Sequence, residues 1–235
     1  MEKVTIKDVA KESEVSIATV SRVLNEVGYV NEQIKVRVLQ AVEKLNYQPN
    51  AVARSLKRDQ TNTIGVILPD ISNPYFMTMS KAIEDCLYDH NYNLIFCSGD
   101  EKPEKEKKLL QLLLEKRVDA IVLSTSSGND AFIKRIHLSG TPVILMDRRV
   151  DYTDLKLDLV EEDNVKGAYE LTKYLIQLGH TKVGVLNGLL DVSTGADRLL
   201  GFRQAIRDFG IRQEEAWIYN GGFTQEGGGR RLTTF

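Results

Sequence analysis

The residues best suited to bind another molecule lie within the first 25 positions of the chain. Ala18, Ser21, Arg22 and Asn25 recur at helical spacing on one face of a predicted helix that begins at Ser16. Small and polar side chains let a helix enter the DNA major groove deeply, where arginine binds the O6 and N7 atoms of guanine and short hydroxyls meet phosphates. The pattern predicts a helix that reads duplex DNA.

The elements that would position this face form a helix-turn-helix over 6–25, followed by a third helix over 31–45. The first helix is predicted over 6–13. The second, over 16–25, begins at Ser16, a favourable N-cap residue. A second face of this helix is apolar and should pack against the rest of the domain; it consists of Val20, Val23, Leu24 and Val27.

Two stretches give the chain a family resemblance. Residues 4–10 (VTIKDVA) followed by 15–25 (VSIATVSRVLN) resemble the headpiece of the lactose/galactose repressor (LacI/GalR) family. Residues 45–56 (LNYQPNAVARSL) are similar to the hinge of that family. The resemblance covers almost the whole chain. It implies a homodimeric regulator, most often a repressor, that binds double-stranded operator DNA under the control of a small sugar.

The resemblance also implies the domain layout. We expect an all-α helix-turn-helix headpiece and an α/β domain of the type I periplasmic-binding-protein class with parallel sheets. The expected boundaries are 1–58 for the headpiece, with its hinge at 50–57, and 59–235 for the effector-binding and dimerisation domain, with subdomains at about 62–160 and 161–235.

Within the headpiece, the resemblance assigns base reading to the first turns of the second helix, at Ile17, Ala18 and Arg22. The residues expected mainly to position phosphates are Thr5, Ser16, Thr19, Ser21 and Asn25. An exposed Ile17 would suit a thymine methyl group. The alternative is that Ile17 packs on the neighbouring helix.

The hinge is expected to fold only on DNA. Residues 50–57 are too few for a stable isolated helix. Two such segments in a dimer would pair and drive Leu56 into a minor-groove step, with Ala53 on the same face.

Composition is compatible with a DNA-facing head on a mildly acidic body. Residues 1–60 hold 10 Lys and Arg against 8 Asp and Glu, and the remainder holds 21 against 25. No signal-peptide pattern opens the chain and no run of 18 apolar residues follows, so we expect a cytoplasmic protein without a membrane segment. Cys86 and Cys97 are expected to be reduced, buried and structural.

From residue 63 onward, short apolar runs alternate with amphipathic helices. Strands are predicted at 63–68, 94–97, 120–123, 142–146 and 183–186, and helices at 75–90, 103–116, 130–138, 164–178 and 198–209. The charged run 101–108 should be a solvated helix start, because its signs alternate. Continuous apolar strands between helices indicate a parallel sheet covered on both faces, with ligands at the carboxyl ends of its strands.

The residues that follow these strands suit a sugar. Aromatic rings stack on sugar faces, and Asp and Arg bond adjacent hydroxyls. Compared with ribose-type periplasmic binding proteins, the sugar-holding positions are Asn73, Tyr75, Phe76, Asp147, Arg148, Arg198 and Phe223. The resemblance therefore favours a ribose-like effector. The alternatives are that Tyr75 and Phe76 pack at a helix start and that Asp147 caps a turn.

Other functions are less consistent with the sequence. His90, His137 and His180 lack metal or nucleophile–base spacing, and the glycine-rich stretch from 221 lacks the residues of a phosphate loop, so neither cofactor nor enzyme activity is expected.

Family members continue beyond the last residue here, so we expect a C-terminally truncated chain with an incomplete second subdomain. The alternatives are a cytoplasmic sugar-binding protein and a non-functional truncated regulator without allosteric coupling.

Overall fold

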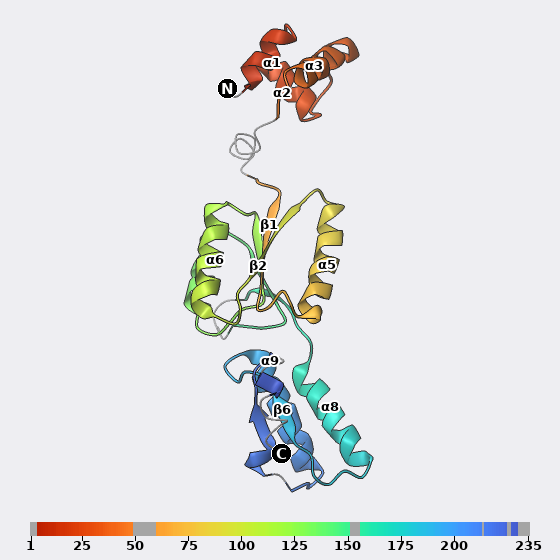
Figure 1. Ribbon diagram of the computed structural model, residues 1–235, viewed down its shortest axis with the longest axis vertical. Helices are drawn as coiled ribbons and strands as arrows, with labels where there is room; N and C mark the ends of the chain where they lie inside the picture. Colours follow the sequence, from red (N-terminus) through yellow and green to blue (C-terminus); the bar gives the residue numbers. More distant parts are fainter. Residues whose placement is uncertain (1–3, 49–59, 151–155, 213, 225–226, 230–235) are drawn as a thin grey trace. The chain divides into compact units, whose positions relative to one another are not determined.

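The computed structural model describes residues 4–48, 60–150, 156–212, 214–224 and 227–229. The chain divides into two compact units, Met1–Thr61 and Asn62–Phe235 (Figure 1). The predicted hinge residues Ala53 and Leu56 lie outside the described residues, so their roles rest on the sequence alone.

The first unit is a three-helix domain whose helices are α1 (Ile6–Glu12), α2 (Ile17–Leu24) and α3 (Glu32–Lys44). Val9, Val20 and Val38, one from each helix, are fully buried together. The predicted cap at Ser16 is confirmed, since its hydroxyl accepts the Thr19 backbone N–H at 3.1 Å. The predicted packing of Val27 is wrong. This residue is exposed because α2 ends at Leu24, so Val27 no longer lies on the apolar face of the helix.

The second unit is built on a parallel sheet with the strand order β2-β1-β3-β4-β5. Its strands are β1 (Thr63–Leu68), β2 (Asn93–Ser98), β3 (Ala120–Leu123), β4 (Val143–Met146) and β5 (Asp158–Val160). The sequence did not predict β5, because its three residues are all exposed and lack a buried apolar pattern.

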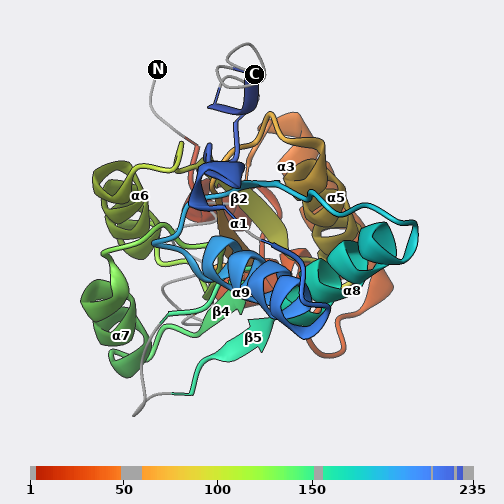
Figure 2. The same ribbon diagram turned by 90° about the horizontal axis from the view of Figure 1, so that it is seen from below.

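Helices cover both faces of this sheet, as Figures 1 and 2 show. The helix α5 (Pro74–Tyr88) packs on one face, and α6 (Pro103–Glu115) and α7 (Asp130–Leu138) pack on the other. The helices α6 and α7 bury Leu110, Leu113 and Ile133 against Ile121 and Leu145 of the strands. Because the strands are parallel, their carboxyl ends and the loops that follow them lie at one edge of the sheet. The predicted ligand residues Tyr75, Asp147 and Arg148 lie at this edge.

The rest of the unit consists of a helix pair and a small parallel sheet. Its elements are α8 (Asn164–Gln177), β6 (Val185–Asn187), α9 (Ser193–Asp208), the 3-10 helix η1 (Glu215–Trp217) and β7 (Ile218–Asn220), with β6 paired to β7. The helices α8 and α9 lie side by side (Figure 2). They approach closely at Gly201, where an added Cβ would lie 2.0 Å from the Val165 carbonyl oxygen.

Two boundaries in this region differ from the prediction. The helix α9 begins at Ser193 rather than at 198, because Ser193, Thr194 and Gly195 are weak helix formers that tertiary packing overrides. Arg198 therefore lies within the helix rather than at its start. The predicted strand 183–186 is shifted to Val185–Asn187, although Val183 is buried against α9.

Both cysteines carry free thiols. The expectation that both are buried is wrong, because Cys86 is exposed and Cys97 is half-buried. Within the described ranges, no helix combines the length and apolarity needed to cross a bilayer.

Candidate functional site

The exposed face of α2 contains the predicted base-reading residues. The cap at Ser16 fixes where the helix begins, and Ile17, Ala18 and Arg22 of the first turns are exposed. Ile17 is 45% exposed and lies outside the apolar cluster of the first unit. The structure thus favours an Ile17 side chain free for contact over the alternative in which it packs on a neighbouring helix.

The predicted phosphate-positioning residues make hydrogen bonds within the first unit. The Thr5 hydroxyl donates to Asp8 at 2.7 Å, and this bond is the main cause that lowers the pKa of the Asp8 carboxyl. The Asn25 amide donates to the Ser21 carbonyl oxygen at 2.7 Å. The Ser16 and Thr19 hydroxyl oxygens lie 2.9 Å apart. A phosphate contact by Thr5 or Asn25 would therefore exchange an internal hydrogen bond for an external one.

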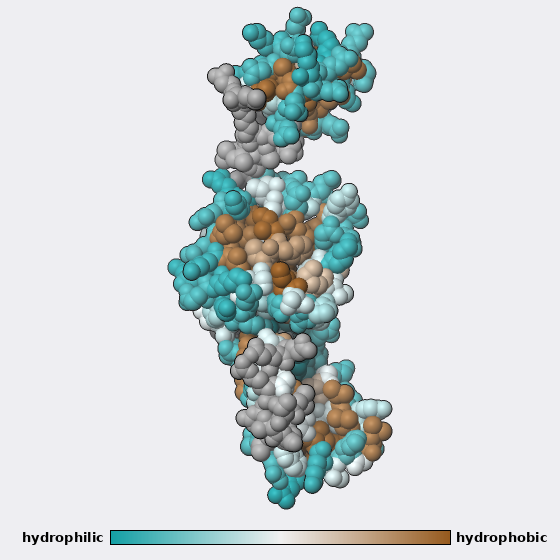
Figure 3. Space-filling view, viewed as in Figure 1, coloured by the Kyte–Doolittle hydropathy of each residue, from teal (hydrophilic) through white to brown (hydrophobic). Residues whose placement is uncertain are grey.

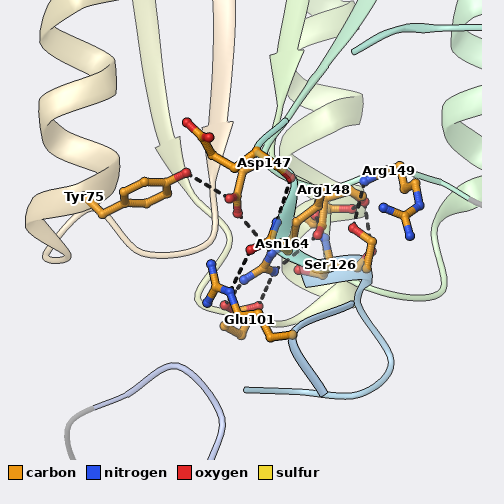
Figure 4. Close-up of polar contacts among 12 residues, drawn as sticks. Tyr75, Glu101, Ser126, Asp147, Arg148, Arg149 and Asn164 are labelled. Carbon is orange, nitrogen blue, oxygen red and sulfur yellow. Dashed lines mark hydrogen bonds and ion pairs between the residues drawn. The ribbon is translucent and has the colours of Figure 1, made fainter. Parts of the chain in front are cut away.

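In the second unit, Tyr75 and Asp147 meet at the edge of the larger sheet. Tyr75 lies in the first turn of α5, and its hydroxyl donates to Asp147 Oδ1 at 2.9 Å (Figure 4). Asp147 follows β4, is buried and has a positive φ of 67°. Burial and then the Asp147 charge raise the pKa of the Tyr75 phenol to about 12. The phenol is therefore a neutral donor at physiological pH.

Arg148 lies next to this pair and is 1% exposed. Its two terminal nitrogens each donate to one Glu101 carboxylate oxygen at 2.7 Å, and Nη1 also donates to the Thr125 carbonyl at 3.3 Å (Figure 4). Its guanidinium carbon lies 4.9 Å from the centre of the Phe223 ring. The prediction that Glu101 is solvated is wrong, because its carboxylate forms an ion pair with the buried guanidinium of Arg148.

Arg198 reaches the same aromatic ring from α9. Its Nε donates to the Asn164 amide oxygen at 2.7 Å, and its guanidinium carbon lies 6.0 Å from the Phe223 centroid. Asn164 is the buried first residue of α8. The contact between α8 and α9 therefore sets the position of Arg198 beside Phe223.

A side-chain hydrogen bond, an ion pair and two cation–π contacts link five of the seven predicted effector residues: Tyr75, Asp147, Arg148, Arg198 and Phe223. Asn73 instead caps α5, where its side chain accepts the Tyr75 N–H at 3.0 Å. Phe76 is 4% exposed in the apolar core and meets the Tyr75 ring edge-to-face at 5.2 Å. The packing alternative raised from the sequence fits Phe76, which supports the Tyr75 ring.

A cavity of about 340 Å³ lies beside Arg148. Its walls are the loop after β3, the residues after β4 and the start of α9 with the loop before it; the lining includes Thr125, Ser126, Ser127, Arg148, Arg149 and Ser193. The buried Arg148 Nε makes no hydrogen bond among the described residues, and it lies 3.8 Å from Asp147 Oδ2. Of the predicted residues, only Arg148 lines this cavity. The polar run 124–128 directly after β3 was the signal that the sequence reasoning missed.

Polar contacts connect the cavity walls. Arg149 forms a two-pronged ion pair with Asp197 of α9 at 2.6 and 2.7 Å and contacts Glu161 at 3.1 Å. These hydrogen bonds raise the pKa of the Arg149 guanidinium. The Ser127 hydroxyl donates to Asp191 at 2.7 Å. The strand ends of the larger sheet are therefore bonded to the start of α9 across the cavity.

Two family models match the chain. Residues 61–234 match "Periplasmic binding proteins and sugar binding domain of LacI family", and residues 5–50 match "Bacterial regulatory proteins, lacI family". The chain belongs to the LacI family. This membership agrees with the helix-turn-helix of the first unit and the parallel α/β fold of the second.

Known relatives of this LacI-family chain are transcriptional regulators. The regulator RegA of Clostridium saccharobutylicum is 41% identical over 216 residues, which make up 92% of this chain and 64% of RegA. The ribose operon repressor of Halalkalibacterium halodurans is 40% identical over 204 residues, or 87% of this chain and 60% of the relative. The chain thus spans somewhat less than two thirds of these two proteins.

A solved lac repressor dimer, described as bound to operator and an anti-inducer, superposes with a TM-score of 0.81 over 99% of this chain and 70% of that one. Its 23% identity supports the fold alone.

Proposed function

We propose that this LacI-family chain is a cytoplasmic, sequence-specific DNA-binding regulator, acting as a repressor, whose DNA affinity is controlled by a small uncharged sugar. The observation that carries the proposal is that one chain contains both an exposed α2 face and a site where Tyr75, Asp147, Arg148, Arg198 and Phe223 converge.

The DNA-binding part of the proposal rests on the exposed side chains of α2. Arg22 reads a guanine, and Ile17 contacts a thymine methyl in the major groove. Ala53 and Leu56 act at the minor groove, as proposed from the sequence.

A duplex is selected from a random pool with the purified chain, and its dissociation constant is measured at rising salt. Affinity for the selected and a random duplex should fall steeply with salt, with the selected duplex bound more tightly at every concentration. Equal affinity for the two duplexes would exclude sequence-specific reading.

The charges around the cavity favour an uncharged ligand. Arg148 is paired with Glu101 and Arg149 with Asp197 and Glu161, while Asp130 and Asp191 also line the cavity. A phosphate entering here would meet cations that are already neutralised, along with two further carboxylates. Hydroxyl groups suit these walls, since Thr125, Ser127 and Ser193 line the cavity with hydroxyls that can donate and accept hydrogen bonds.

The effector class is tested by calorimetric titration of ribose, other pentoses and hexoses, and ribose 5-phosphate into the chain. We expect an uncharged sugar, with ribose favoured, to bind at least about tenfold more tightly than the phosphorylated sugar, since a desolvated anion without a free cation is costly. Asp147→Ala and Arg198→Ala should abolish binding. Tighter binding of ribose 5-phosphate would overturn the charge argument, and absence of binding to every sugar would overturn the effector class.

The homodimer is the third part of the proposal. The strand β2 is an edge of the larger sheet, and Phe96 on it is partly exposed. Figure 3 shows apolar side chains gathered on the visible face of this unit, over the strand labelled β2 in Figure 1. An edge of this kind is a pairing surface for another chain. Sedimentation equilibrium should give twice the chain mass, with Phe96→Lys shifting the species toward monomer. A monomeric wild-type chain would exclude the dimer.

A further inference from the structure

The charged run 101–108 contains one carboxylate that is buried behind the cavity wall. Glu106, in the first turns of α6, is 1% exposed, whereas Glu104 in the same turn is exposed. The expectation that the whole run is solvated is therefore wrong at Glu106 as well as at Glu101. A buried carboxylate is costly unless hydrogen bonds satisfy it, so its partners indicate what it stabilises.

Among the residues that the structure describes, the hydrogen-bond donors to Glu106 come from one loop, the segment between β3 and α7. The Ser126 backbone N–H donates to Oε2 at 2.5 Å, and the Asn129 amide donates to Oε1 at 2.9 Å. The Thr125 hydroxyl lies 3.0 Å from Oε1 and shares its proton with the Ser126 carbonyl, 2.8 Å away. The other hydrogen of the Asn129 amide binds the Pro103 carbonyl at 2.8 Å, which ties the loop to the start of α6.

These partners are neutral: a backbone N–H, a hydroxyl and a side-chain amide. Burial raises the pKa of the Glu106 carboxyl, while the hydrogen bonds from the loop lower it. The pKa of this carboxyl stays raised overall, so the hydrogen bonds from the loop offset part of the burial penalty and couple the conformation of residues 125–129 to the carboxylate.

The same loop forms a wall of the cavity. Thr125 and Ser126 line it together with Ser127 and Gly128, whereas Glu106 does not. The Ser126 backbone is held by Glu106, and the Ser126 side chain also acts on this carboxylate by lowering its pKa. Arg148 donates to the Thr125 carbonyl, so the loop also contacts the buried arginine of the site.

We propose that Glu106 is a positioning residue for effector recognition: its carboxylate fixes the loop 125–129, so that Thr125, Ser126 and Ser127 form the cavity wall against which the sugar binds. This inference rests on the proposed effector function. Both carboxylate oxygens are needed, because one accepts the Ser126 N–H and the other accepts the Asn129 amide. Glutamine has nearly the same shape, yet one of its terminal atoms is a donor and would face another donor.

The test compares Glu106→Gln with Glu104→Gln, which removes the same charge from the exposed side of α6. Amide hydrogen exchange is measured in the full chain, and ribose affinity is measured by calorimetry. For Glu106→Gln we expect the Ser126 amide to exchange at least about tenfold faster and the ribose dissociation constant to rise about tenfold, as expected for loss of a charge-assisted hydrogen bond. Exchange in β1 should not change. Glu104→Gln should match the wild type.

Asn129→Ala provides a milder variant that keeps the carboxylate, removes one donor and does not alter a cavity-lining residue. It should shift both measurements in the same direction by a smaller factor, and it keeps the proposal testable if Glu106→Gln does not fold. Unchanged ribose affinity in a folded variant whose loop exchanges faster would overturn the proposal, as would unchanged exchange of Ser126. If the wild type does not bind ribose, the proposed effector is wrong, and the exchange result alone decides whether Glu106 orders the loop.

Discussion

The contact between α8 and α9 gives the most quantitative prediction. A Cβ added at Gly201 would lie 2.0 Å from the Val165 carbonyl oxygen, 2.9 Å from its carbon and 3.0 Å from the Tyr169 nitrogen. All three are backbone atoms of α8, so no side-chain rotation relieves the overlap. Reaching an ordinary contact of about 3.5 Å requires the helices to separate locally by about 1.5 Å.

The expected cost follows from two opposing terms. Overpacking of this kind costs about 1–3 kcal/mol, and rigid backbone places Gly201→Ala near the upper end. Replacing a mid-helix glycine by alanine returns about 1 kcal/mol through helix propensity. The net prediction is a loss of about 2 kcal/mol in the free energy of unfolding. Gly167 of α8 has no atom within 4 Å of its added Cβ, so Gly167→Ala should instead stabilise the chain by about 0.5–1 kcal/mol.

The assay is urea unfolding followed by fluorescence of Trp217, the single tryptophan of the sequence, which lies near the small sheet of the same region. The urea midpoint should fall for Gly201→Ala and rise for Gly167→Ala. Because the contact also sets the Arg198–Asn164 bond, Gly201→Ala should weaken ribose binding as well. A midpoint for Gly201→Ala equal to or above that of the wild type would refute the close-approach argument.

Three further predictions address single side chains. Arg22→Ala should weaken the selected duplex by about 1–3 kcal/mol and relax preference at one base pair; equal losses on random DNA in anisotropy titrations would reject base reading. Glu101→Gln leaves the Arg148 charge buried and should lower stability to urea by about 3–5 kcal/mol, whereas a loss below about 1 kcal/mol would show that the pair is dispensable. The pKa of Tyr75 is raised from its ordinary value of about 10 to about 12 in the folded chain, so between these pH values the phenol is ionised in the unfolded chain and neutral in the folded one. The free energy of unfolding therefore falls as pH rises from 10 to about 12. Tyr75→Phe should make this loss shallower in pH-dependent unfolding, and an unchanged slope would contradict the raised pKa.

The sequence predicted those elements whose local signals agree with their packing. Ser16 begins α2 because its hydroxyl caps the helix locally, and the apolar run 63–68 forms β1 with the predicted bounds. Local reasoning was wrong at α9, which extends through Ser193, Thr194 and Gly195; Gly195 lies against the Leu189 backbone, and its carbonyl accepts the Asn187 amide at 2.9 Å. It also missed β5, which pairs with β4 without burying its side chains.

The residues of the candidate site also fall into those that the sequence placed correctly and those that it missed. Tyr75, Asp147 and Arg148 follow strands or begin a helix, so the predicted topology and the family resemblance together placed them in one site. Glu101 and Glu106 escaped notice because alternating charges normally indicate a solvated helix, and their burial depends on Arg148 and on loop 125–129, which are distant in sequence. Phe76 has the residue type of a ligand contact, and only the packed core shows that it is covered.

The central claim, that one chain couples a sugar to DNA binding, is tested most directly by the DNA dissociation constant with and without saturating ribose. We predict that ribose weakens binding of the selected duplex by about 5–150-fold, that the duplex weakens ribose binding by the same factor, and that Asp147→Ala removes both effects. An identical DNA dissociation constant with and without ribose, in a chain shown by calorimetry to bind ribose, would contradict the account.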